Sequence, residues 1–555
     1  MKEGRSGVAS SNSAGFRNIF LLSFLLFSLG TACVEIVRID VRFAIFVQDL
    51  TRYPLSVFPT INGVPYPDYP VAMTLIAWLF SAGGRFLNQW TLSLFSMLCG
   101  SLTVALVWLT GEKMKKGTGL IAASLLFMTL EFNSTIMGFG IDVPVMTAGA
   151  LMLYLLSAGS RRCPGIFFPV LLVFCFLIRG PMGLVLLGAA VGGWILFARQ
   201  WKRVVTWGIA GAVTLAGCTG GGYFLIRAAG GQDLFDQFLS WQVTSRMAAD
   251  DLFFYLLDGP VVFSPSTALA IATLLTAAAV PRARRHSGQV LLPLFGFLLF
   301  PLILLSIPGC KHLRYMMITI PAFALTGAWG IRMSFAFPRC RRILRTVFRI
   351  LAAYGWIAAM CAALAVTVVT AVMANVFDAG LFFRCALLPV LFPAAGLLYR
   401  KKKGFLRDIF RTGLVLGLLG TAFIFPATTC RELSEKFVRS TEHYRTGRLC
   451  FYRIGVDHED LKYLRFLSPE DRAEVRYLGP VSNQDNKYSR MYRQIGFEGL
   501  ADMKPGDVLV ARSRDAEQLN KDAALYGRKA VFLSRGKLGH REYSAFEIRP
   551  ANSTD

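Results

Sequence analysis

The chain has 555 residues, of which 54% are hydrophobic and 17% charged, and its mean hydropathy is +0.50. This composition excludes an ordinary soluble protein, because the charged residues are gathered between long apolar runs. A net charge of +25 would suggest a nucleic-acid partner in a soluble protein. Here the basic residues lie in short loops, where topology and anionic lipid headgroups account for them, so we expect no nucleic-acid partner.

Apolar runs of spanning length recur along the first 428 residues. Because a helix needs about 20 apolar residues to cross a bilayer, we expect about thirteen transmembrane helices. They are predicted near residues 17–36, 88–110, 117–132, 142–158, 165–179, 181–198, 204–226, 261–280, 289–306, 312–331, 347–375, 381–399 and 408–427. The apolar stretch 71–82 is too short to span, which favours a re-entrant or interfacial helix.

Basic residues mark every second loop between these predicted helices. If the N-terminus is cytoplasmic, the cytoplasmic loops are those that begin at Lys113, Arg161, Arg199, Arg282, Arg339 and Arg400, and all are basic. This alternation is the positive-inside pattern of a multi-pass membrane protein, and counting 71–82 as a span would destroy it. We therefore expect an inner-membrane protein with a cytoplasmic N-terminus and a C-terminal domain on the periplasmic side.

Charge also occurs in four segments on the opposite, non-cytoplasmic side, namely 35–70, 179–181, 227–258 and 311–314. Charge gathered on one face against the positive-inside trend indicates a functional site there. Within the third of these segments, the stretch 233–258, which contains Asp236, Trp241 and Gln242, fits either a mobile loop able to cover a cleft or a plain solvated loop.

The first of these segments contains a candidate carboxylate and a candidate arginine. Apolar residues recur at helical spacing over 39–50, which predicts a short amphipathic helix, and Asp40, Arg42 and Asp49 fall off its apolar stripe. In one interpretation, Asp40 is a general base and Arg42 binds a phosphate. In the other, the loop packs on helix ends and both side chains are solvated. A proline-rich stretch then presents Tyr66, Asp68 and Tyr69.

The remaining candidates lie at the ends of predicted spans. Asp142 fits an N-cap, with Pro144 in the first helical turn, and this position is compatible with a further role at the site. Arg179 would reach either an anionic ligand or lipid headgroups, and headgroups are the simpler interpretation. Lys311, Arg314 and Tyr315 form a basic connection that would neutralise a phosphate or anchor the chain at the interface. We favour the phosphate.

After residue 428 the composition becomes that of a soluble protein. Short β-like runs at 475–478, 508–511, 530–533 and 543–548 alternate with helix-compatible stretches such as 515–526. We expect a transmembrane domain over 1–428 and a small soluble α/β domain over 429–555.

The order of these motifs resembles one family. Asp-x-Arg-aromatic at Asp40, Gly-x-x-Tyr-x-x-x-Pro ending at Pro70, Asp-x-Pro at Asp142, Arg-Gly-Pro at Arg179 and Lys-His-Leu-Arg-Tyr ending at Tyr315 follow one another on one side of the membrane. The pattern is similar to the GT-C membrane glycosyltransferases, specifically the aminoarabinose lipid A transferases and related protein O-mannosyltransferase-like enzymes. Two positions depart from it: Ile39 replaces an acidic residue, and Tyr69 stands where lysine is usual.

The resemblance implies an all-α polytopic membrane protein of the GT-C fold with a small C-terminal soluble α/β domain. It implies transfer of a sugar from a polyprenyl-phosphate donor to a lipid A-like, glycan or protein acceptor at the outer face of the cytoplasmic membrane. Asp40 or Asp142 would act on the acceptor, Arg42, Lys311 and Arg314 would stabilise the departing phosphate, and membrane lipids would surround the protein. Tyr66 and Tyr69 would shape the cleft.

The sequence also bears on cofactors and on two rival functions. No nucleotide is expected, because the donor is lipid-linked and the sequence has no phosphate-binding P-loop motif. No metal ligand set is convincing, although a divalent metal beside Asp40 and Asp68 stays open. The rival interpretations are a transporter or flippase of lipid-linked sugars, and a non-catalytic relative of the family. No internal repeat typical of transporters is visible.

Overall fold

The computed structural model describes residues 3–31, 36, 40–158, 163–242, 244, 253–309, 311–337, 342–347, 350, 413, 431–453, 462–479, 493–538 and 541–551. The spans predicted at 347–375, 381–399 and 408–427 lie almost entirely outside these residues. The chain forms two compact units. The bundle unit comprises Met1–Ala32, Pro67–Met73 and Ser93–Ala427, and the sheet unit comprises Cys33–Tyr66, Thr74–Leu92 and Thr428–Asp555.

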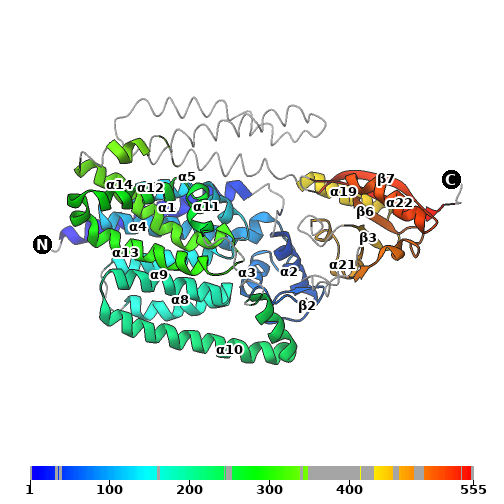
Figure 1. Ribbon diagram of the computed structural model, residues 1–555, viewed down its shortest axis with the longest axis horizontal. Helices are drawn as coiled ribbons and strands as arrows, with labels where there is room; N and C mark the ends of the chain where they lie inside the picture. Colours follow the sequence, from blue (N-terminus) through cyan, green and yellow to red (C-terminus); the bar gives the residue numbers. More distant parts are fainter. Residues whose placement is uncertain are drawn as a thin grey trace. The chain divides into compact units, whose positions relative to one another are not determined.

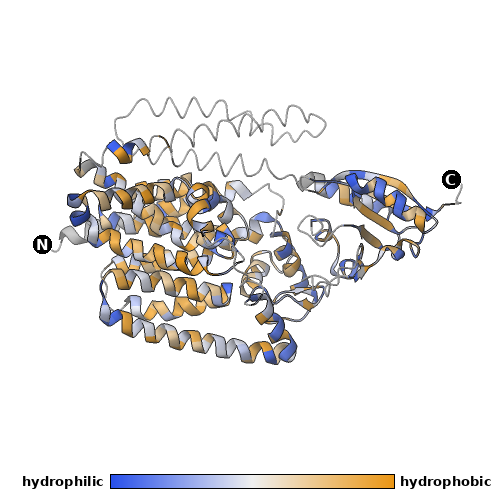
Figure 2. Ribbon diagram, in the orientation of Figure 1, coloured by the Kyte–Doolittle hydropathy of each residue, from blue (hydrophilic) through white to orange (hydrophobic). Residues whose placement is uncertain are grey.

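Apolar helices build the bundle unit (Figure 1), and their ribbons are mostly hydrophobic in Figure 2. In the described part of the chain, five are long and apolar enough to cross a membrane: α1 (Glu3–Thr31), α4 (Gln89–Met114), α10 (Trp201–Gln242), α13 (Pro281–Ser306), and η2 (Leu313–Thr319) continued by α14 (Ile320–Ala336). Two bent pairs also qualify: α5 (Thr118–Met128) with α6 (Leu130–Met137), and α11 (Phe254–Val262) with α12 (Ser266–Ala279). Shorter apolar helices are α7 (Val143–Ser157), α8 (Cys163–Arg179) and α9 (Pro181–Phe197).

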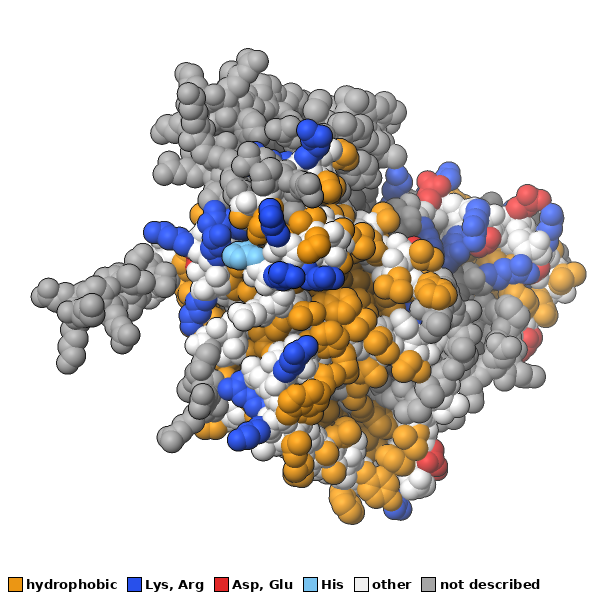
Figure 3. Space-filling model, turned by 60° about the vertical axis from the view of Figure 1, so that its left-hand side comes forward, with side chains coloured by type: hydrophobic (Ala, Val, Ile, Leu, Met, Phe, Trp, Pro, Cys, Tyr) orange, Lys and Arg blue, Asp and Glu red, His pale blue; other side chains and the backbone are white. Residues whose placement is uncertain are grey.

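Every span predicted before residue 337 coincides with one of these helices or bent pairs. The polytopic helical architecture is therefore confirmed. On the face shown in Figure 3, apolar side chains form a broad area bordered by Lys and Arg side chains. Such a surface suits lipid tails flanked by headgroups.

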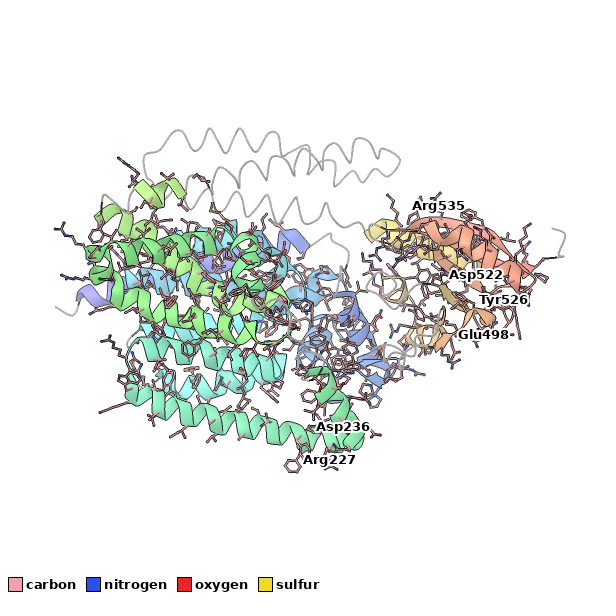
Figure 4. All side chains as sticks on the ribbon, viewed as in Figure 1. Arg227, Asp236, Glu498, Asp522, Tyr526 and Arg535 are labelled. Atoms are coloured by element: carbon pink, nitrogen blue, oxygen red, sulfur yellow. The ribbon has the colours of Figure 1, made fainter. Side chains whose placement is uncertain are left out.

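Helix α10 differs from its prediction. It continues beyond residue 226 to Gln242 and is broken only at Gly230 and Gly231, where the backbone leaves helical geometry. Gly231 has φ 70°, a conformation that favours glycine. Arg227 and Asp236 lie on the two sides of this break (Figure 4). The expectation of a loop from residue 227 is wrong for this part, because the glycine pair interrupts the helical pattern without ending it.

The span predicted at 117–132 is not straight. Thr129 is extended, with φ −86° and ψ 100°, and α5 and α6 meet there at an angle of 72°. The Thr129 hydroxyl lies 2.9 Å from the hydroxyl of Ser266, so the polar atoms at this bend find partners inside the unit.

Close backbone packing joins α9 to α13, which lie side by side in Figure 1. A Cβ atom built on Gly193 would stand 2.1 Å from the carbonyl oxygen of Gly296, and one built on Gly296 would stand 2.2 Å from that of Gly193. Only glycine at both positions permits this approach, as is common where membrane helices pack through small residues.

In the sheet unit, the segment after α1 forms α2 (Asp40–Arg52), a hairpin of β1 (Thr60–Ile61) and β2 (Val64–Pro65), and most of α3 (Ala72–Phe80). The two predicted short helices are confirmed: α2 extends from Asp40 to Arg52 where 39–50 was predicted, and α3 lies within the predicted 71–82 with nine residues, too few to span. Asp40, Arg42 and Asp49 of α2 are buried, however, rather than solvated.

The C-terminal part of the sheet unit is a six-stranded sheet of order β5-β4-β3-β6-β8-β7. Its strands are β3 (Leu449–Tyr452), β4 (Arg476–Leu478), β5 (Arg493–Ile495), β6 (Val508–Arg512), β7 (Arg528–Leu538) and β8 (Arg541–Pro550). The first four in spatial order are parallel, and β8 and β7 are antiparallel. Helices α19 (Arg431–Tyr444), α21 (Pro469–Glu474) and α22 (Ala516–Leu525) accompany them. All four predicted strands and the helix over 515–526 are confirmed.

Candidate functional site

A buried ion pair lies where α7 begins and α8 ends in the bundle unit. Asp142 occupies the N-cap position of α7, as predicted, but its side chain makes no capping hydrogen bond. Instead, its Oδ1 accepts a hydrogen bond of 2.7 Å from Nε of Arg179, whose side chain is only 1% exposed. The expectation that Arg179 reaches lipid headgroups is therefore wrong. Gly180, with φ 74°, and Pro181 turn the chain into α9 directly after the arginine.

A second arginine shares the same carboxylate. Nε of Arg314, in η2, lies 3.7 Å from Oδ2 of Asp142, and its side chain is 22% exposed. Two guanidinium groups thus face one carboxylate, which leaves one positive charge in excess. Because a buried charge without a partner costs several kcal/mol, this arrangement favours an additional anion.

Arg179 retains unused hydrogen-bond donors. Among the described residues, its Nη1 and Nη2 atoms have no hydrogen-bond acceptor although both are buried. Its Cζ atom lies 5.6 Å from the ring centroid of Tyr69 and 5.1 Å from that of Tyr315. Aromatic faces stabilise a desolvated cation but leave its in-plane donors open. A guanidinium with two open donors is suited to two oxygen atoms of one phosphate.

The 311–315 segment turns its arginine inward. Arg314 and the buried Tyr315 point into the cluster, whereas His312 is exposed and its ring lies 5.4 Å from that of Tyr315. The hydroxyl of Tyr255, in α11, accepts the His312 N–H at 3.2 Å and donates to its carbonyl at 3.3 Å. Lys311 is partly buried and stands just before this anchored residue.

The segment Pro67–Met73 contributes Asp68 and Tyr69 to the bundle unit. Asp68 is 4% exposed, and its Oδ1 accepts a 3.2 Å hydrogen bond from Nε2 of Gln242, which also donates to the Asp68 carbonyl. Gln242 ends the unpredicted part of α10. Gln242 falls in the stretch 233–258, for which a loop was expected, and no local pattern pairs it with Asp68, which is 174 residues away. Together, Asp142, Arg179, Arg314, Tyr69 and Tyr315 form what we call the arginine cluster.

In the sheet unit, α2 and the hairpin bring together a second group. The Asp40 carboxylate accepts a 3.0 Å hydrogen bond from Nε2 of Gln89, and Nη1 of Arg42 donates a 2.8 Å hydrogen bond to the hydroxyl of Tyr66. The Tyr66 ring centroid is 5.2 Å from Cζ of Arg42. Asp40 and Arg42 are 5% and 7% exposed, so the interpretation with both side chains solvated is wrong. Sequence reasoning missed Gln89, which stands just before an apolar run.

Metal binding was considered for Asp40 and Asp68, which belong to different units. Within the described ranges, no group of three or more His, Cys, Asp or Glu side chains is arranged to hold a metal ion. The donors of the arginine cluster are suited to an anion rather than to a cation.

Comparisons with known proteins bear on this arrangement. Residues 68–220 match the family model described as dolichyl-phosphate-mannose-protein mannosyltransferase. Over 97% of its length, the chain has the fold of ArnT from Cupriavidus metallidurans bound to undecaprenyl phosphate, with TM-score 0.68, 14% identity and 98% of that chain covered. The apo structure of the same protein gives TM-score 0.65 and 15% identity, with 98% of each chain covered. No curated protein matches the chain in sequence. The predicted resemblance to the GT-C glycosyltransferases is confirmed.

Proposed function

We propose that this protein is an integral membrane glycosyltransferase that moves a sugar from a polyprenyl-phosphate donor to a lipid A-like, glycan or protein acceptor. The observation that supports it best is Arg179, buried, paired on one side with Asp142 and left with two open donors. A phosphate on a long apolar lipid is an anion that such a site can bind at the end of apolar helices. The GT-C fold and the neighbour's undecaprenyl phosphate support the same donor class.

In the proposed reaction, a hydroxyl or phosphate oxygen of the acceptor attacks the anomeric carbon of the sugar. The bond between that carbon and the donor phosphate oxygen breaks, and polyprenyl phosphate leaves with the bonding electron pair. In this proposal the proton of an acceptor hydroxyl passes to the carboxylate of Asp40, as the family resemblance implies. Arg179, Arg314 and Lys311 stabilise the phosphate of the leaving group, and the resemblance assigns phosphate binding to Arg42 as well.

The other site residues have positioning roles in this proposal. Asp142 is engaged by two guanidinium groups, so it orients Arg179 and Arg314 rather than acting as the base. Tyr69 and Tyr315 hold the guanidinium of Arg179 between their rings, and Tyr66 holds Arg42. Asp68, bound by Gln242, shapes the approach of the sugar.

The proposed location is the outer face of the inner membrane. Residues 1–428 would form the transmembrane domain with a cytoplasmic N-terminus, and residues 429–555 a periplasmic domain. The alternation of basic loops supports this orientation.

Transfer of radiolabel from polyprenyl-phosphate sugars in membranes tests the proposal. We expect transfer by wild type and a loss of about 100-fold or more in Asp40→Asn and Arg42→Ala. Arg227→Met, which removes an exposed arginine of α10, serves as the matched control and should transfer normally. Equal transfer by all variants would refute the site, and no transfer by wild type with any donor would refute the reaction.

A further inference from the structure

A fully engaged arginine of α21 joins helix α2 to the C-terminal part of the sheet unit, beside a 2.8 Å hydrogen bond from Nε2 of Gln48 to the carbonyl oxygen of Arg465. Arg472 of α21 has a side chain with 0% exposure and pairs with Asp49 of α2, whose side chain is also 0% exposed. Its Nη1 donates to Oε1 of Gln48 at 2.8 Å, and its Nε donates to Oδ1 of Asn62 at 3.2 Å. All three guanidinium nitrogens are thus bound by residues that precede the bundle's second span. In Figure 1, α2 and α21 lie side by side within the sheet unit.

The partners of Arg472 come from two different elements. Gln48 and Asp49 belong to α2, whereas Asn62 is in the two-residue turn between β1 and β2. Asn62 and Gly63 have φ angles of 54° and 77°, as a tight hairpin turn of this kind requires. Oδ2 of Asp49 also accepts hydrogen bonds from Thr60 and from the Gly63 N–H, both at 3.3 Å. Arg472 and Asp49 together therefore fix α2 against the hairpin.

The same two elements hold the proposed reaction groups. Arg42 is in α2, and its partner Tyr66 directly follows β2, where the Tyr66 N–H donates to the carbonyl of Pro59 at 2.8 Å. Arg42 and Asp49 are seven residues apart, so they share a face of the helix, about 10 Å apart along its axis. A rotation of α2 about that axis would move Arg42 and Asp40 as well. The contacts of Asp49 restrain that rotation, together with the buried apolar side chains of α2.

We propose that Arg472 is a positioning residue that couples the C-terminal domain to the Asp40–Arg42 segment. It holds α2 and the hairpin in the arrangement that lets Arg42 reach Tyr66. The inference rests on the proposed function for what Asp40 and Arg42 do, but not for the coupling itself. The C-terminal residues then take part in positioning the proposed reaction groups, chiefly through the buried side chain of Arg472.

A surface contact between the same elements provides the matched control. Nε of Arg52, in α2, lies 2.9 Å from Oε1 of Glu470, in α21, and both side chains are more than half exposed. An exposed pair of this kind contributes little, because water screens it. Arg52→Met therefore removes one positive charge between the same two helices without disturbing the buried junction.

The first experiment measures hydrogen exchange of the full-length protein in detergent micelles, which needs no substrate. Peptides covering 40–52 and 59–66 should exchange faster in Arg472→Met than in wild type, and Arg52→Met should leave them unchanged. Arg472→Lys keeps the positive charge but loses the planar guanidinium group with its several donors, so these peptides should exchange at an intermediate rate. Unchanged exchange in Arg472→Met would refute the coupling, whatever reaction the protein catalyses.

The second experiment measures sugar transfer in a double-mutant cycle. We expect Arg472→Lys to lower kcat/KM at least about tenfold in an otherwise wild-type protein. In a Tyr66→Phe background, where the hydrogen bond from Arg42 to the Tyr66 hydroxyl is already absent, the same change should cost clearly less. Equal losses in both backgrounds would mean that Arg472 merely stabilises the fold, and this would refute the positioning role.

Milder variants keep the test decisive if Arg472→Met does not fold. Asn62→Gly removes one acceptor of Arg472 and keeps a residue that tolerates the positive φ of the turn. Gln48→Ala removes another acceptor together with the 2.8 Å hydrogen bond from Gln48 to the carbonyl of Arg465. Both should shift exchange and transfer in the same direction by smaller amounts, and normal exchange and transfer in both would also refute the proposal. If wild type transfers no sugar while Arg472→Met still exchanges faster, the coupling stands and the proposed reaction fails.

Discussion

At the scale of single residues, Asp142 is the counter-charge of the arginine cluster. It faces Arg179 at 2.7 Å and Arg314 at 3.7 Å, and its side chain is 6% exposed. Removing three charged groups from water is unfavourable, and the attraction between the carboxylate and the guanidinium groups offsets this only while all three are present. The cluster is therefore sensitive to the loss of its one carboxylate.

We predict that Asp142→Asn destabilises the protein by about 3 kcal/mol, because it leaves the buried guanidinium of Arg179 and the partly buried one of Arg314 without their carboxylate. Thermal unfolding in detergent measures the effect. Asp236→Asn removes an exposed carboxylate of α10 and should unfold as wild type does. In Arg179→Met, the further change Asp142→Asn should cost less, since one of the two arginines is already absent. An additive loss would contradict the pairing.

A second carboxylate, Asp507 in the C-terminal domain, makes stability depend on pH. Burial alone would raise its pKa, but hydrogen bonds from the Arg448 side chain and from the backbone N–H groups of Lys504 and Arg448 outweigh burial and lower the pKa below the usual 3.8. The folded state thus holds its proton less tightly than the unfolded state. The stabilisation is present above pH 3.8 and is lost as pH falls through the lowered pKa.

We therefore predict that acid unfolding of the C-terminal domain becomes less steep in Asp507→Asn. Far-ultraviolet circular dichroism of the full-length protein, followed from pH 6 to pH 2, measures this unfolding. Glu474→Gln, at the exposed end of a surface pair with Arg493, is the control and should keep the wild-type slope, because water screens such a pair. Identical profiles for all three proteins would contradict the role of Asp507.

At the scale of elements, helices of the bundle unit pack closely against one another at particular glycines. Gly193 of α9 and Gly296 of α13 approach so closely that neither tolerates a Cβ atom. Gly288, two turns earlier on α13, has open space where its Cβ would be. The two positions on one helix separate the effect of packing from that of helix propensity.

We predict that Gly296→Ala destabilises the bundle by about 1–3 kcal/mol, because α9 and α13 must move apart. Gly288→Ala should be neutral or slightly stabilising, since alanine is the better helix former. The midpoint of thermal unfolding in one detergent compares the two variants. Equal midpoints would show that the close approach is not required.

At the scale of the whole molecule, the sequence predicts the helical architecture well and the site less completely. Spans, short interfacial helices and most strands follow from apolar runs and alternation, which depend on local sequence. The ion pair of Asp142 with Arg179 does not, because 37 residues separate them and Asp142 also fits an N-cap. The pairing of Asp49 with Arg472 joins positions 423 residues apart, and no local pattern indicates such a contact.

Burial explains why individual interpretations of charged residues failed. Arg179 was expected to reach lipid headgroups, and Asp40 and Arg42 fitted a solvated helix face as well as a site. A charged residue near the end of an apolar run has the same sequence signature whether it points to water or into the protein. The two orientations differ in whether a side chain elsewhere in the same unit pairs with the charged residue, as Gln89 does with Asp40.

We propose that Arg179 holds the phosphate of a polyprenyl donor, and the proposed reaction depends most on this contact. Binding of undecaprenyl phosphate to the purified full-length protein in nanodiscs tests it directly. We expect Arg179→Met to weaken binding at least about tenfold, because charge-assisted hydrogen bonds are lost, while Arg227→Met binds as wild type does. Equal affinity in wild type and Arg179→Met would contradict the proposed phosphate site.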